Sequence, residues 1–510
     1  MTRTLPLALA GITFTLAACS ADDNASDITA ATVTDLVDTT AVQTTEDITT
    51  TTPEENDMPT RDLTVTGPVN SGRGIPQTAT PIDLSSAGYV EEEFFVSGVA
   101  TSYSPTGEIG FDGHWNAVPA STAPFTTRIL VRRPVDASKF NGVTVVEWFN
   151  ASSAVDIDVD FVFTNQELLR GGYAWVGVTA QAIGVNGDGS ASPFGPGAVG
   201  LKIWDPERYA PLSHPGDSYS YDIFTAVGEA LLHPGDVDPL NGLGVEHLLA
   251  TGESQSAFRL LTYANAIQPL ANVYDGIMIH SRGGSGAPLG VDGMIGGDVP
   301  MAAQVRDDLD IPVFQVQTET DLVSLVPTSP FTAARQPDSS MVRTWEVVGT
   351  AHSDSYYLSR LTEQGNAQFE GFLDLSNVLP IMNSGPQNFI MNSALRSLTN
   401  WVANGVEPAK ASPIEIADGA IVRDADGIAV GGLRTPQVDV PIATLTGEGM
   451  SMIGRTVPFD ASVLATRYGD KAGFLAAFTD SLDAAISAGF LLADDRDAIL
   501  VAAAEHYPAG

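Results

Sequence analysis

Short, continuous runs of β-branched and other apolar residues recur along the chain and are bounded by Gly, Pro or polar residues. The clearest of these runs span 142–148, 173–178, 248–250, 276–280, 311–316 and 342–348. Such runs are typical of strands buried on both faces of a parallel sheet. Helical spacing of apolar positions is found over 161–170, 219–232, from 257 onward, and over 392–404. This alternation predicts an α/β fold with a mostly parallel central sheet and helices on both faces.

The globular pattern begins near Leu63, so we predict one large domain over 63–510. Two segments rich in Gly interrupt it as insertions. Residues 180–218 also carry Pro and aromatic residues and are expected to form a long loop along one wall of the substrate site, and 282–304 are expected to form a small lid. Residues 411–455 read as irregular. Residues 460–505 predict a C-terminal extension of two or three helices, which either pack against the core or contribute to a cap.

The N-terminus resembles a bacterial lipoprotein signal. An apolar run after Arg3 ends in Leu16-Ala17-Ala18-Cys19, which resembles a lipobox with Cys19 as the lipid-bearing residue. Residues 1–18 are then the signal peptide, and the run is too short to span a bilayer. The resemblance implies a lipid-anchored protein of the bacterial cell envelope, on the outer membrane and facing the periplasm or the surface. The alternative is an ordinary secretory signal in which the chain's single Cys is incidental.

Residues 19–62 are rich in Thr, Asp, Glu and Ala and contain no aromatic residue. Such a segment buries too little apolar surface to offset the entropy of ordering, so we predict a disordered acidic tether.

The overall charge excludes some classes of partner. Acidic residues outnumber basic ones 62 to 24, which gives a formal net charge of −38. A surface this negative repels nucleic-acid phosphates and anionic membranes, so a lipid at Cys19 is the only membrane contact that we expect. The sequence has no phosphate-binding glycine loop and no Cys/His metal cluster, so we expect neither a cofactor nor a metal. It does not indicate the oligomeric state.

The most informative stretch lies where the run 248–250 meets the following helical pattern. It reads Gly252-Glu253-Ser254-Gln255-Ser256, a variant of the G-x-S-x-G nucleophile elbow. Small residues flank the central Ser because the tight turn brings neighbouring backbone close together. We therefore predict Ser254 as a nucleophile in a strained conformation, with the N–H of Gln255 stabilising an oxyanion at the helix N-terminus. The alternative is that Ser254 merely caps the helix.

A serine nucleophile needs a histidine base oriented by a carboxylate, and both should follow it in the chain. Of the three later histidines, His506 lies at the C-terminus and His280 precedes any suitable carboxylate. His352 follows the last predicted strand and is the expected base. Asp321 or Glu319, after the preceding strand, is the expected acid, with Asp321 favoured by its offset.

The loop after the strand 142–148 is the expected source of the second oxyanion donor, which we assign to Asn150 or its neighbours.

Three motifs together resemble the bacterial and fungal family described as "alpha/beta hydrolase domain-containing protein". They are Gly252–Ser256, Gln317-Thr318-Glu319-Thr320-Asp321, and Trp345 to His352, and 146–150 is also similar to an early-strand signature of the family. The resemblance implies an α/β-hydrolase fold and a serine esterase-type site. Ser256 in place of the last Gly of the elbow fits this family.

The expected function is that of a serine hydrolase that cleaves a small-molecule carboxylic ester through an acyl-enzyme. Ser254, Asp321 and His352 would form its catalytic triad. An amidase or peptidase on the same triad remains open, as does a non-catalytic lipoprotein that binds a ligand.

Overall fold

The computed structural model describes residues 61–187, 198–293, 299–323 and 329–508. The predicted signal 1–18, Cys19 and all but the last two residues of the predicted tether lie outside these ranges, as do parts of the two insertions. Within the described residues, none of the helices is both long and apolar enough to cross a membrane.

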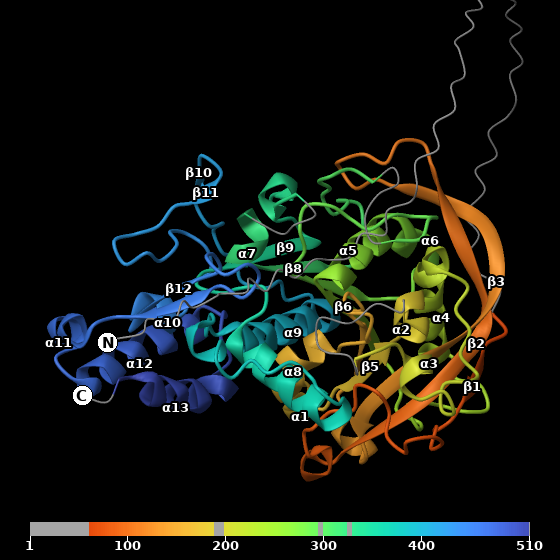
Figure 1. The fold of residues 1–510 in the computed structure, drawn as a ribbon. Coiled ribbons are helices and arrows are strands. Elements are labelled where there is room, and N and C mark those ends of the chain that lie inside the picture. The colour runs from red at the N-terminus through yellow and green to blue at the C-terminus, as the bar shows by residue number, and fades with distance from the viewer. Residues whose placement is uncertain (1–60, 188–197, 294–298, 324–328, 509–510) are drawn as a thin grey trace, which may run out of the picture.

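A nine-stranded sheet forms the centre of the molecule, in the order β1-β2-β3-β5-β4-β6-β7-β8-β9 (Figure 1). The strands are β1 (Thr64–Thr66), β2 (Tyr89–Thr106), β3 (Asn116–Pro134), β4 (Val143–Trp148), β5 (Ala174–Val178), β6 (His247–Glu253), β7 (Gly276–His280), β8 (Val313–Thr318) and β9 (Val342–Val347). The six strands from β5 to β9 in this order pair in parallel, whereas β1, β2 and β3 are antiparallel. The mostly parallel sheet agrees with the sequence pattern.

Helices cover both faces of the sheet. Consecutive residues of its central strands point to opposite sides, so apolar side chains on both faces need a covering layer. In β6, Leu248 and Ala250 pack on one face with α4 (Ser220–Leu232) and α5 (Gln255–Thr262). Leu249 packs on the other face with α1 (Val159–Gly171), α8 (Ser355–Gln368) and α9 (Gln387–Asn404). The sequence pattern did not indicate α8.

The hairpin of β2 and β3 is much longer than the strand-like runs of this region in the sequence, which span 89–99 and 127–132. The two strands stay paired out to Thr106 and Asn116 and curve along one side of the molecule (Figure 1). The outer part is rich in Ser, Thr, Ala and Pro, and its β3 strand is mostly exposed, so no apolar run marks it. Backbone hydrogen bonds between β2 and β3, which follow each other in the chain, account for the length of the hairpin.

The long-loop reading of 180–218 was wrong for the parts that form α2 (Ala182–Asn186) and α3 (Leu201–Trp204). The irregular reading of 411–455 was also wrong in part. This segment contains β10 (Ile416–Ala417), β11 (Ala420–Ile421), α10 (Pro436–Asp439) and β12 (Ala443–Thr446), and β12 pairs with β13 (Arg455–Pro458). The helices and strands in both segments are too short for their apolar residues to show a helical or strand period in the sequence.

The C-terminal helices α11 (Ala461–Tyr468), α12 (Lys471–Ser487) and α13 (Arg496–His506) gather at the end of the molecule opposite the β2–β3 hairpin (Figure 1). Phe474, Phe478 and Leu482 of α12 join the core cluster that contains Trp345 of β9. Of the two readings for this segment, packing against the core is therefore the one that the structure supports.

A fully buried guanidinium on β3 anchors the loop that follows β4. Arg128 Nη2 donates to Asp156 Oδ2 at 2.7 Å, and its other nitrogens donate to Thr179 Oγ1 and to the carbonyl of Gln77. Asp156 lies in the loop that begins at Phe149 and reaches the active-site edge of the sheet, so this ion pair fixes the loop.

We expect Arg128→Ala to lower the free energy of unfolding by about 3–5 kcal/mol, because it leaves the buried Asp156 carboxylate without its cation. Arg496→Ala is the matched control, since Arg496 pairs with Asp483 on the exposed surface of α12 and α13. Its free energy of unfolding should stay close to that of the wild type. Urea unfolding measures both, and equal losses would contradict the assignment.

Candidate active site

Ser254 lies between the end of β6 and the start of α5, in a backbone conformation that non-glycine residues rarely adopt. Its φ is 56° and its ψ is −116°. A Cβ added at Gly252 would lie 2.9 Å from Ser256 Cβ, so the two small flanking residues face each other across the turn. The predicted strained elbow, with small residues required at both flanks, is therefore confirmed.

The structure brings Ser254, His352 and Asp321 together. His352 Nε2 lies 2.8 Å from Ser254 Oγ, and His352 Nδ1 lies 2.8 Å from Asp321 Oδ1. Asp321 Oδ2 accepts from the backbone N–H and the hydroxyl of Thr318 at 2.7 and 2.8 Å, which fixes the rotation of the carboxylate. His352 and Asp321 are buried, whereas Ser254 is half-buried and reachable. Such an arrangement can transfer a proton from the hydroxyl to the imidazole.

Glu319, the other candidate acid, points away from the imidazole. Its Oε1 accepts from Gly349 N at 2.7 Å, and its Oε2 accepts from Arg423 Nη2 at 2.8 Å and from Gly447 N at 3.1 Å. Glu319 thus joins the start of the His352 loop to the segment around Gly447. Of the two carboxylates, Asp321 is the one in contact with the histidine.

The first predicted oxyanion donor, the N–H of Gln255, is at the first position of α5, where a backbone N–H has no partner within the helix. The Gln255 side chain is held by Gln181, which accepts from its Nε2 at 2.7 Å.

Asn150 reaches the site but does not offer its backbone N–H, which donates to the carbonyl of Ile157 at 3.1 Å. Its side-chain Nδ2 donates to Glu253 Oε2 at 3.1 Å and to the Glu253 carbonyl at 3.3 Å. Its Oδ1 accepts from the backbone N–H of Ser152. Asn150 therefore supports Glu253 in this structure, and the second oxyanion donor, assigned from the sequence to Asn150 or its neighbours, stays a prediction.

Glu253, next to the nucleophile, is a buried carboxyl inside the site. Its Oε1 lies 3.1 Å from His352 Nε2, the nitrogen that also faces Ser254. Burial raises the pKa of Glu253 to about 7, although the two histidines near it pull the pKa down. Burial alone would lower the pKa of His352, but the carboxylates of Glu253 and Asp321 raise it above its ordinary value. From the sequence, Glu253 was a neighbour of the nucleophile that either touches substrate or points into supporting structure, and its contact with His352 was not visible.

His280, the other histidine near the elbow, has both ring nitrogens engaged away from Ser254. Nδ1 faces Asp160 Oδ1 at 2.8 Å and Nε2 faces Gln387 Nε2 at 2.9 Å. It belongs to a buried polar network beneath the site.

A small pocket of about 70 Å³ opens beside Ser254. Its lining consists of Asn150, Ser152, Ser153, Ile157, Glu253, Ser254, His352, Ser353, Tyr357, Leu358, Met452 and Ile453. Of the segment 180–218, which was expected to form one wall, none of the described residues lines this pocket. The C-terminal helices do not line it either.

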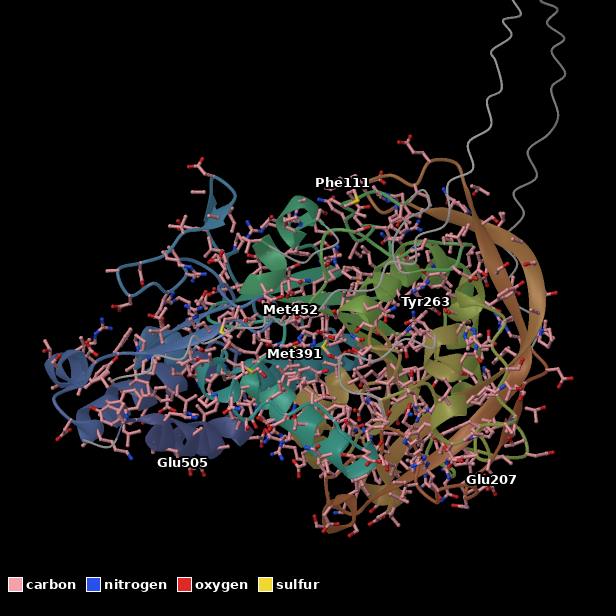
Figure 2. All side chains as sticks on the ribbon, viewed as in Figure 1. Phe111, Glu207, Tyr263, Met391, Met452 and Glu505 are labelled. Carbon is pink, nitrogen blue, oxygen red and sulfur yellow. The ribbon has the colours of Figure 1, made fainter. Side chains whose placement is uncertain are left out.

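Part of the wall of the pocket beside Ser254 is the hairpin loop 447–454, between β12 and β13, which the sequence pattern did not indicate. Its Met452 carbonyl accepts from Ser353 N at 2.9 Å, beside the catalytic histidine. A Cβ on Gly447 would lie 2.6 Å from Thr320 N and from Thr350 O, so only glycine allows this close approach. Met452, labelled near the centre of Figure 2, packs against Phe258 of the elbow helix.

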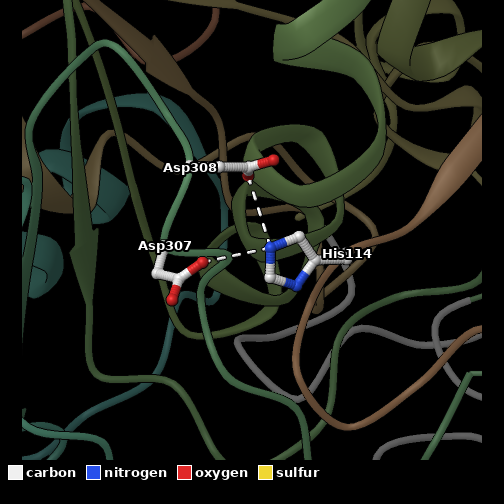
Figure 3. Close-up of side chains that lie close together, drawn as sticks. All are labelled: His114, Asp307 and Asp308. Carbon is white, nitrogen blue, oxygen red and sulfur yellow. Dashed lines mark ion pairs between the residues drawn. The ribbon is translucent and has the colours of Figure 1, made fainter.

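One cluster away from the elbow has the residue types of a metal site. The side chains of His114, Asp307 and Asp308 have ligand atoms within 4.8 Å of one another (Figure 3). The two carboxylates are exposed, and Asp308 is paired with Arg306 at 2.6 Å. An exposed, already paired cluster of this kind gives no reason to assign an ion.

The sequence model of the family described as "Alpha/beta hydrolase domain" matches residues 65–501. An α/β serine hydrolase homologue from Coxiella burnetii is 14% identical, with 48% of this chain and 90% of that chain covered and a TM-score of 0.26. An α/β serine hydrolase without a lid from Xanthomonas campestris is 13% identical, with 52% and 93% covered and a TM-score of 0.27.

Among curated proteins, the comparison finds no significant match. The family match and the order of the strands confirm the predicted fold class.

Proposed function

The chain belongs to the alpha/beta hydrolase domain family, and on that premise we propose that it is a serine hydrolase that cleaves carboxylic esters through an acyl-enzyme. The observation that carries the proposal is the continuous contact from Ser254 Oγ through the His352 ring to Asp321, at 2.8 Å on each side. The nucleophile stands on a strained elbow at the carboxyl end of β6, where parallel strands present their reactive residues.

In the first half of the reaction, Ser254 Oγ attacks the ester carbonyl carbon while its proton moves to His352 Nε2. The Nδ1–H donates to Asp321 Oδ1, which keeps the imidazole in the required tautomer and stabilises the imidazolium. The imidazolium then gives its proton to the leaving alcohol as the C–O bond breaks. The product of this half is an acyl group on Ser254.

The developing negative charge on the carbonyl oxygen needs donors that are in place beforehand. The N–H of Gln255 is one, at the positive end of α5, and a donor of this kind contributes roughly 10²–10³ in rate. Water, deprotonated by His352, then attacks the acyl carbon; the bond to Ser254 Oγ breaks, the imidazolium returns the proton to Oγ, and the acid is released. No step requires a metal or an organic cofactor.

The pocket beside Ser254 is walled by Ile157, Tyr357, Leu358, Met452 and Ile453, together with polar residues. Its volume of about 70 Å³ suits one short apolar group. We therefore expect short acyl esters to react better than long ones.

The test is hydrolysis of p-nitrophenyl esters, from acetate through decanoate, by the full-length chain, with the matched p-nitroanilides in parallel. We expect turnover of the esters, highest for the short chains, and no turnover of the anilides. Turnover of the anilides alone would favour an amidase. If a fluorophosphonate labels Ser254 but no ester is turned over, the ester assignment is wrong while the serine-hydrolase machinery stands.

A further inference from the structure

The mechanism above leaves one buried carboxyl of the active site without a role. Glu253 lines the pocket beside Ser254, is 4% exposed, and directs Oε1 to within 3.1 Å of His352 Nε2. His352 therefore has a carboxyl group at each ring nitrogen, Asp321 at Nδ1 and Glu253 at Nε2. Only the first of these belongs to the triad.

The contact at Nε2 has a chemical consequence, because Nε2 carries a single lone pair when the imidazole is neutral. The Ser254 hydroxyl must donate to that lone pair to be activated, and a protonated Glu253 would donate to the same one. We propose that Glu253 is a second active-site carboxyl that shares one proton with His352 Nε2, and that Ser254 becomes reactive only when the pair has released this proton. The inference rests on the proposed roles of Ser254 and His352.

The proton of the pair has two positions. It lies on Glu253 Oε1, as a carboxylic acid that donates to Nε2, or it lies on Nε2, as an imidazolium that faces the carboxylate. In both forms Nε2 cannot accept from Ser254 Oγ. Release transfers the proton to water, leaves a carboxylate and a neutral imidazole, and restores the base.

The surroundings favour retention of this proton near neutral pH. Burial is the main cause that raises the pKa of Glu253 to about 7; His352 and His280 lower it, and the carboxylates of Asp160 and Asp321 add to the rise. Asn150 Nδ2 opposes it by donating to Oε2 at 3.1 Å. The titratable groups that face Glu253 are His352 after β9, His280 at the end of β7, Asp160 in α1, Asp321 in α7 (Glu319–Val323) and Tyr357 in α8. Because the two groups titrate together, the pH midpoint of activity belongs to the pair.

The sign of the effect follows from the charge. A carboxylate 3.1 Å from Nε2 stabilises the imidazolium, so its removal should make His352 lose its proton at lower pH. In Glu253→Gln we therefore expect the acid limb of reactivity to move down by about one pH unit or more. The plateau at high pH should also fall, because the imidazolium of the transition state loses the same stabilisation.

The experiment measures the second-order rate of inactivation by a fluorophosphonate from pH ~5 to pH ~10, on the full-length chain. This reaction needs only a competent Ser254 and no ester turnover. We expect the Glu253→Gln midpoint to lie below that of the wild type. Glu319→Gln is the matched control, since Glu319 is a buried carboxyl that contacts the His352 loop but not the ring. The pH midpoint of inactivation of Glu319→Gln should equal that of the wild type, even if its rate of inactivation differs.

Asn150→Ala provides a second, independent variant. It removes the donor to Glu253 Oε2, so the carboxyl should hold its proton to higher pH and the midpoint should move up. Opposite shifts of the midpoint in the two variants support the proposal. If Glu253→Gln does not fold, an upward shift of the midpoint in Asn150→Ala supports it alone. A Glu253→Gln midpoint equal to that of the wild type, or an unmoved Asn150→Ala midpoint, overturns it. No labelling of the wild type at any pH overturns the proposed function instead.

Discussion

Ser254→Ala is expected to lower kcat/KM for the best ester by about 10⁶-fold, because the acyl-enzyme route is lost with the nucleophile. His352→Ala should lose about as much, since the hydroxyl then has no base at 2.8 Å. The double variant should be no worse than either single one, because the residues act as a unit. Steady-state kinetics on the three proteins measures this.

Ser256→Ala is the matched control for this series. Ser256 lies two residues beyond Ser254, and its buried hydroxyl has no hydrogen-bond partner in the part of the chain that the structure describes. Its loss should leave kcat/KM close to the wild-type value. A large loss in Ser256→Ala, or full activity in Ser254→Ala, would contradict the assignment of the nucleophile.

Asp321→Asn is expected to lower kcat by about 10⁴-fold. The reason is the orientation that Thr318 imposes. Its backbone N–H donates to Asp321 Oδ2, so an Asn would keep its oxygen there and present its NH₂ group to His352 Nδ1. Nδ1 would then act as an acceptor, and the proton of the neutral ring would lie on Nε2, where it blocks proton transfer from Ser254.

Glu319→Gln tests the alternative acid in the same assay. The variant keeps one acceptor oxygen but weakens the ion pair with Arg423, so we expect a loss of stability and a much smaller loss of kcat than in Asp321→Asn. The reverse order of the two losses would make Glu319 the functional acid. Thermal unfolding measured alongside separates the structural loss from the catalytic one.

The elbow was predictable because its signal is local. An apolar strand, a small-x-Ser-x-small turn and an amphipathic helix follow one another within a few residues, and the turn requires small residues where Gly252 and Ser256 face each other. His352 and Asp321 were placed by a second rule, since loops after successive parallel strands meet at one edge of the sheet. The structure brings these residues together as that rule predicts.

Other parts of the site depend on contacts that no local pattern records. The sequence could not say that the Asn150 backbone N–H is taken by Ile157, or that its side chain turns to Glu253. The hairpin loop 447–454 comes from a segment with no visible period, yet it places Met452 on the pocket wall. Likewise, the offset from the strand favoured Asp321 over Glu319, but only their contacts in space show which carboxylate reaches His352.

The central claim is that Ser254 carries the acyl group between the two halves of the reaction. The most direct measurement is to mix the full-length protein with p-nitrophenyl acetate, quench in acid during turnover, and map the acetylated peptide by mass spectrometry. We expect one acetyl group on the peptide that contains Ser254, and none in Ser254→Ala. Ester turnover with the acetyl group on another residue, or an acetylated site that persists in Ser254→Ala, would contradict the claim.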